Sequence, residues 1–259
     1  MDRNTILAIV LSAVVLLGWE IFIAGPQRKA YEQTLQQQRA AQAEQAGPSA
    51  TAPAQALETL TVEEALKNAP GRVPIATDSL IGSINLKGAR IDDLQLKAYR
   101  ETVDPKSPLI RLFSPRETKH GHYMQEGWRT SSGAAEDALW TAPAGAKLTP
   151  ATPLTLTRRE GGLVFEKTFS VDNKFMFAVT QTVRNEGATT ETVTPYGLVV
   201  QRNIPDGSGK YSVVREGPIA VIDNSLLQRV YKAIAKGKNA PPLSGTKGWA
   251  GITSKYWLA

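Results

Sequence analysis

Hydrophobic and polar residues alternate with a period of two in the middle of the chain, most clearly from Leu163 to Val183. The apolar positions are Leu163, Phe165, Phe169 and Val171, then Phe175, Phe177, Val179 and Val183. The turn-forming run Asp172-Asn173-Lys174 separates the two groups. Because successive side chains of a strand point to opposite faces, this pattern predicts a β-hairpin with one buried face.

Shorter segments of the same kind flank the hairpin, with turn-forming residues between them. The expected strands are Leu80–Leu86, Ile91–Leu96, Leu109–Phe113, Glu191–Val193 and Tyr196–Gln201. Many short strands joined by frequent turns are typical of an antiparallel sandwich or barrel. We therefore predict a mainly β domain over residues 73–245.

The first apolar run, Thr5–Ala24, has 20 residues and one charge, Glu20. At about 1.5 Å per residue a helix of this length spans roughly 30 Å, the thickness of a bilayer's hydrocarbon core. The run exceeds the roughly 7–15 residues of a signal-peptide core, and no A-x-A site follows it. We predict an uncleaved transmembrane anchor at residues 1–26, although charge alone leaves its orientation open. Its anchor residues are Ile6, Leu7, Val10, Leu11, Val14, Leu17 and Trp19.

Residues 27–72 are rich in Gln, Ala and Pro, which is typical of a tether. A coiled coil is disfavoured because few apolar residues fall at heptad spacing. Near the end of the tether, Thr61 and Glu64 have the spacing of a capping box, and Pro70-Gly71 would stop a helix. We expect one short helix there.

Two segments near the C-terminus have apolar residues at helical spacing. In Asn224–Lys236 the spacing predicts a helix, with a short strand at Arg229–Tyr231 as an open alternative. In residues 246–259 the residues that would share a helical face are Trp249, Ile252, Tyr256 and Ala259.

Aromatic rings beside lysines suit a helix that lies in a membrane interface. We therefore predict an interfacial amphipathic helix at 246–259, with packing of the same helix on the domain as the alternative. The proposed membrane-interface residues are Trp249, Ile252, Lys255, Tyr256 and Trp257.

The charge distribution draws attention to the same part of the chain. The net charge is +6, from 30 basic and 24 acidic residues. Residues 210–259 hold eight basic and two acidic side chains, and 8 − 2 equals the whole net charge. We hypothesise that Lys247 and Lys255 hold the terminal segment against anionic lipid headgroups. Binding of nucleic acid is disfavoured because no nucleic-acid module is visible.

Candidate chemistry is sparse. The chain has no cysteine and two histidines, which excludes disulfides, thiolate sites and multi-histidine metal sites. His120 and His122 form an H-x-H run that we expect in a surface loop. We expect Asp92 and Asp93 to face opposite ways as solvated residues, and Glu20 to reach water near the anchor's end. No catalytic, cofactor or metal site is predicted.

The N-terminal MDRNTILAIVLS, the tether, the β-domain and the final KGWAGITSKYWLA together resemble the bacterial YidC family of membrane insertases. Gly248-Trp249, Gly251-Ile252-Thr253 and Lys255-Tyr256-Trp257 resemble the family's GGW-x-G-[FI]-T-D-K-Y-W segment. Lys247 replaces the first Gly of that pattern, and Ser254 replaces the Asp. The resemblance covers essentially the whole chain but only the N-terminal half of the family's protein.

The resemblance implies that residues 1–26 are the first transmembrane helix, with a cytoplasmic N-terminus. It implies that residues 73–245 are a periplasmic β super-sandwich similar to galactose mutarotase. The segment 246–259 would then lie along the outer leaflet of the inner membrane and lead to a second transmembrane helix that is missing here.

The family inserts membrane proteins, alone or beside the Sec translocon, with a groove built from later transmembrane helices. No second apolar run of 18 or more residues exists in this chain. We therefore expect a fragment without enzymatic activity that contacts membrane lipids, nascent membrane proteins and Sec components including SecD and SecF. A membrane-anchored periplasmic carbohydrate-binding or epimerase-like protein and a structural periplasmic adaptor remain as alternatives.

Overall fold

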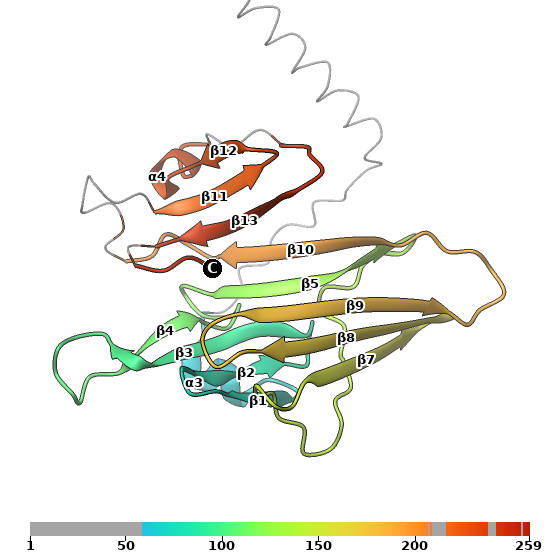
Figure 1. The fold of residues 1–259 in the computed structure, drawn as a ribbon, viewed down its shortest axis with the longest axis horizontal. Coiled ribbons are helices and arrows are strands. Elements are labelled where there is room, and N and C mark those ends of the chain that lie inside the picture. The colour runs from blue at the N-terminus through green and yellow to red at the C-terminus, as the bar shows by residue number, and fades with distance from the viewer. Residues whose placement is uncertain (1–58, 207, 209–215, 238–241, 255) are drawn as a thin grey trace, which may run out of the picture. The chain divides into compact units, whose positions relative to one another are not determined.

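A computed structural model of the chain describes residues 59–206, 208, 216–237, 242–254 and 256–259 (Figure 1). The predicted anchor at 1–26 and most of the predicted tether therefore lie outside the described residues. Within the described ranges, no helix is both long enough and apolar enough to cross a bilayer.

The short helix expected at the end of the tether is confirmed as α3, Val62–Lys67. Its capping box is complete, since the Glu64 amide donates to Thr61 Oγ1 at 3.2 Å and the Thr61 amide donates to Glu64 Oε2 at 2.9 Å. This reciprocal pair satisfies two amides that a helix start otherwise leaves without partners.

The described residues form three antiparallel sheets, and the largest contains seven strands. Its central order is β1 (Arg72–Ala76), β2 (Leu80–Asn85), β3 (Arg90–Arg100), β5 (His122–Thr130) and β10 (Thr194–Gln201). In addition, β4 (Leu109–Phe113) pairs with β3, and β6 (Gly133–Ala134) pairs with β5. The strands expected near 80, 91, 109 and 196 are therefore confirmed, whereas Glu191–Val193 forms no strand.

The second sheet contains β7 (Leu154–Glu160), β8 (Leu163–Val171) and β9 (Phe177–Asn185). The predicted hairpin corresponds to β8 and β9. In β8 the apolar row is buried as predicted, with Phe165 and Phe169 both 0% exposed. In β9 the matching row is only half-buried, and Phe175, expected in the same row, lies before the strand and is 52% exposed.

The core lies between the first and second sheets, which Figure 1 shows as two layers. Trp128 of β5 meets Phe165 of β8 with ring centroids 5.1 Å apart, and it stacks on Trp140 at 6.4 Å. The expectation of a mainly β, antiparallel domain is confirmed.

Asp92 and Asp93 were expected in solvent, and this was wrong. The exposed fractions of the two residues are 0% and 7%. A register shift between Ser83 and Ile84 breaks the regular alternation of β3 against β2. The two carboxylates pair with arginines from neighbouring strands, Asp92 with Arg72 and Asp93 with Arg111. Burial raises the pKa of Asp92, and Arg72 opposes that rise.

The third sheet is formed by β11 (Gly217–Ile222), β12 (Ser225–Gln228) and β13 (Gly248–Thr253) in the order β12-β11-β13. The helix predicted over Asn224–Lys236 is therefore wrong in its first half, and helix α4 covers only Tyr231–Ile234. Asp223 and Asn224 have φ angles of 43° and 68°, the left-handed conformation required by a two-residue hairpin turn. This turn makes the following residues a strand.

The predicted interfacial helix at 246–259 is also wrong, because the segment forms β13 and then folds back on itself. The Ile252 amide donates to the Ala259 carbonyl at 2.7 Å, and the reverse bond is 3.1 Å. A strand places Trp249 and Ile252 on opposite faces, and their exposed fractions are 46% and 8%. The helical face inferred from the spacing does not exist.

We expect Phe165→Ala to lower the free energy of unfolding by about 3–5 kcal/mol, because it leaves a cavity against Trp128. Thr182→Ala, on the exposed face of β9, is the matched control and should change stability by less than about 0.5 kcal/mol. Urea unfolding followed by tryptophan fluorescence measures both. A loss of under about 1 kcal/mol for Phe165→Ala would show that this contact does not anchor the two layers.

Candidate functional site: an apolar pocket beside the C-terminal sheet

A pocket of about 460 Å³ lies where β5 and β10 meet the third sheet. The strands that supply its walls are β5, β10, β11, β12 and β13. The residues that line it are Met124, Glu126, Gly197, Leu198, Val199, Pro218, Ile219, Ala220, Leu227, Arg229, Ala250, Gly251 and Ile252. Most of these side chains are apolar, so the pocket suits an apolar occupant.

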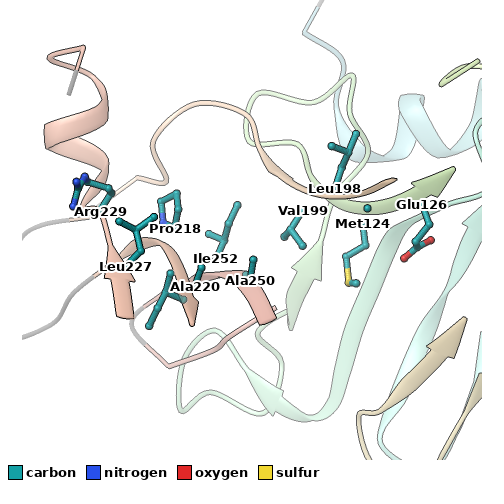
Figure 2. Close-up of a pocket in the computed structure, with 13 residues that line it drawn as sticks. Met124, Glu126, Leu198, Val199, Pro218, Ala220, Leu227, Arg229, Ala250 and Ile252 are labelled. Carbon is teal, nitrogen blue, oxygen red and sulfur yellow. The ribbon is translucent and has the colours of Figure 1, made fainter. Parts of the chain in front are cut away.

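Sheet register brings the two walls together. Val199 is the ladder partner of Met124 on one wall, and Ala250 is the partner of Ala220 on the other. Figure 2 shows Val199 and Met124 on the side of the first sheet and Ile252 and Ala250 on the side of the third. Gly197 adds space, since a Cβ at this position would meet nothing within 4 Å. At Gly251, by contrast, a Cβ would lie 2.3 Å from the Ala259 carbonyl oxygen.

Two charged residues mark the ends of the pocket. Arg229 donates from Nη1 to the Gln228 carbonyl at 2.9 Å. Glu126 is largely buried, and among the described residues its Oε2 has no hydrogen-bond partner. Burial raises the pKa of Glu126, and the nearby Lys167 opposes that rise. A buried oxygen without a donor is costly, so Glu126 Oε2 can accept a hydrogen bond from an occupant.

Lys167 lies next to Glu126 and is 1% exposed. Its Nζ donates to the Glu126 carbonyl and lies 4.7 Å from the centroid of the Trp140 ring. Arg158 adds a second cation to this aromatic cluster, 4.3 Å from the centroid of Phe165. Burial lowers the pKa of Lys167 to about 8, with Glu126 acting in the opposite direction.

Sequence reasoning missed both Lys167 and Glu126. A usable signal for Lys167 was the period of two, because it falls between Phe165 and Phe169 on the buried row of β8. No sequence pattern marks Glu126, because it lies beside Lys167 only through the packing of β5 against β8.

The predicted interface residues separate in space. Ile252 lines the pocket and is buried, while Trp249 and Tyr256 are 46% and 71% exposed. Trp257 packs edge-on against Tyr99 with centroids 5.1 Å apart. Lys255 lies outside the described residues, as do the anchor residues from Ile6 to Trp19.

The H-x-H run is not a surface loop throughout. His120 does lie before β5, with Nε2 3.1 Å from Asp206 Oδ2. His122 is the first residue of β5 and packs edge-on against Phe113 at 4.9 Å. Burial lowers the pKa of His122. In the described part of the chain, no group of three or more side chains could hold a metal ion.

Comparisons with known proteins agree on one family. The family model of the YidC periplasmic domain matches residues 72–259. The "Membrane protein insertase YidC" of Rhizobium etli (strain CIAT 652) is 44% identical over 277 residues, covering 100% of this chain and 46% of the relative. The protein of the same description from Beijerinckia indica subsp. indica is 42% identical over 279 residues, with the same coverage. The chain thus spans just under half the length of these curated relatives.

The lowered pKa of Lys167 predicts a pH dependence of stability. Between pH about 8 and about 10.5 the Lys167 amine is protonated in the unfolded state but largely neutral in the folded state. Because the unfolded state binds more protons there, the free energy of unfolding should rise with pH across that window. The gain is on the order of 3 kcal/mol at most.

In Lys167→Met, which keeps the side-chain volume, this contribution should vanish. The measurement is the difference between the wild-type and variant unfolding free energies, taken at several pH values from 7 to 11. Parallel pH profiles for the two proteins would contradict the lowered pKa of Lys167.

Proposed function

Because this chain belongs to the YidC family of membrane protein insertases, we propose that it forms the periplasmic β-domain of an insertase. In that role it holds apolar segments of client membrane proteins outside the bilayer. The observation that carries the proposal is the apolar pocket between β10 and the third sheet. Its walls are aliphatic and its volume of about 460 Å³ suits apolar side chains.

The family supports the remaining parts of the proposal. The first two sheets are taken to form a super-sandwich of the galactose-mutarotase type. Residues 1–26 are taken to anchor the chain in the inner membrane with the N-terminus in the cytoplasm. The Sec translocon, including SecD and SecF, is the proposed partner of the whole insertase. Enzymatic activity is not part of the proposal, and the insertase groove would belong to the other half of the protein.

Contact with the lipid surface is a second candidate role, favoured by one observation. Several large apolar side chains of the C-terminal part are exposed beside the basic residues found there. They are Leu226, Val230, Leu243, Trp249, Tyr256 and Leu258. Exposed apolar and aromatic groups beside lysines suit an anionic membrane interface. If the domain contacts lipid in this way, Trp249 and Tyr256 face the lipid, whereas Ile252 does not.

We expect Gly197→Trp to reduce client contact, because a Cβ at position 197 meets nothing within 4 Å and the ring attached to it would occupy pocket space. The readout is photocrosslinking of a ribosome-bound nascent membrane protein to a photoreactive residue at position 227, in the intact insertase that carries this domain. The yield should fall by at least about fivefold, as expected when an apolar site is lost. Ala178→Trp, on the exposed face of β9, is the control and should crosslink like the wild type. Equal yields in all three proteins would overturn the pocket as the client site.

The lipid role predicts a different outcome. Residues 57–259 should float with vesicles that contain anionic lipid, and binding should weaken as salt rises. Lys247→Gln combined with Trp249→Ala should reduce flotation by about tenfold, since each basic residue contributes on the order of 1 kcal/mol. Lys106→Gln, on the loop before β4, serves as the charge control. Equal flotation with neutral and anionic vesicles would remove the electrostatic part of this role.

A further inference from the structure

A small polar cavity lies where β5 lacks a ladder partner on one of its two sides. On the first side β5 pairs with β10 along nearly its whole length. On the other side it pairs with β3 at Met124 and with β6 at Arg129 and Thr130. Residues 125–128 therefore have no ladder partner there in the described part of the chain. All four of them line a cavity of about 10 Å³.

Side chains from other segments fill most of this gap. Lys167 of β8 donates from Nζ to the Glu126 carbonyl, and Gln125 Nε2 donates to the Glu136 carbonyl at 2.6 Å. Arg158 of β7 lines the same cavity. None of the residues that line it is exposed, so the cavity belongs to the interior of the domain.

Two buried polar atoms of residues that line this cavity lack a partner. Among the described residues, Arg158 Nε and Glu126 Oε2 form no hydrogen bond. The first is a donor and the second an acceptor. Lys167 has donors to spare, because an ammonium group carries three hydrogens. Leaving such atoms unsatisfied in a core costs stability, so the cavity favours an occupant that both donates and accepts.

Size and charge restrict what that occupant is. About 10 Å³ is close to the space that one water molecule needs, and it is too small for a segment of polypeptide. A halide ion would lie beside a carboxylate and would leave Glu126 Oε2 without a donor. A metal cation would lie beside the positive charges of Lys167 and Arg158. Of these species only water both accepts and donates, and a buried water requires two to four polar partners.

We propose that one internal water molecule occupies this cavity, accepts hydrogen bonds from Lys167 Nζ and Arg158 Nε, and donates one to Glu126 Oε2. The water joins β5 of the first sheet to β7 and β8 of the second. It takes the place of a direct ion pair between Lys167 and the Glu126 carboxylate. A carboxylate oxygen has two acceptor positions, so this bond does not compete with one to an occupant of the apolar pocket. The proposal therefore does not depend on the proposed client site.

Proton-detected solid-state NMR of the full chain in phosphatidylcholine bilayers tests the site. The probe is the methyl group of Ala135, which lines the cavity and carries no exchangeable hydrogen. An internal water should give a cross-peak between the water resonance and this methyl group. The exposed methyl group of Ala178 is the control and should give none, because surface water exchanges rapidly. The Ala135 cross-peak should persist when sulfate replaces chloride at constant ionic strength.

A pair of variants tests the acceptor. Glu126→Leu removes it, whereas Glu126→Gln keeps an oxygen in a side chain of the same shape and is the matched control. The Ala135 cross-peak should be lost in Glu126→Leu and kept in Glu126→Gln. The wild-type measurement stands by itself if a variant fails to fold. Absence of the cross-peak from the wild-type chain, a methyl shift that follows the chloride concentration, or the same result in both folded variants would overturn the proposal.

Discussion

The contact on which the fold depends is the packing of the inner row of β8 against β5. Phe165 and Phe169 are completely buried, and Phe165 meets Trp128 across the space between the two sheets. Each sheet has an apolar face that is unstable in water, and burying these faces against each other supplies most of the stabilising free energy. The other features of the domain are arranged around this layer, including the pocket.

Packing the two sheets together also buries charged side chains, including Arg90 and Lys167. Arg90 is 0% exposed, and its Nε donates to Gln125 Oε1 at 3.0 Å while Nη2 pairs with Asp137. Lys167 is held by a carbonyl oxygen and an aromatic ring in place of a carboxylate contact. Such groups destabilise a core unless they are paired, but they also fix one register, because a shift by one residue would leave each of them without its partner. We interpret the charged cluster as a device that specifies how the two sheets align.

The C-terminal sheet shows why a domain of this kind can carry an open pocket. Its strand β13 contacts β10 of the first sheet, and the apolar walls of the two sheets face each other across the pocket. Three of the residues that line the gap on the third sheet are small, Ala220, Ala250 and Gly251, and they lie among larger ones such as Ile219 and Leu227. The small volume of these three residues keeps the space open, and an open apolar space exchanges its water readily for apolar groups of another molecule.

The sequence by itself determined the local elements: the Leu163–Val183 hairpin, the capping box at Thr61 and the strands near 80, 91 and 109. These depend on a period of two or on a few adjacent residues. It also determined the family, through the segment from Gly248 to Trp257. Only the tertiary structure decided that Gly248–Thr253 is a strand, because its pairing with β11 outweighs the helical spacing of Trp249, Ile252, Tyr256 and Ala259. The burial of Asp92, the contact of Lys167 with Glu126 and the pocket were likewise decided by the tertiary structure. Each depends on residues from different strands, and no local pattern records which strands become neighbours.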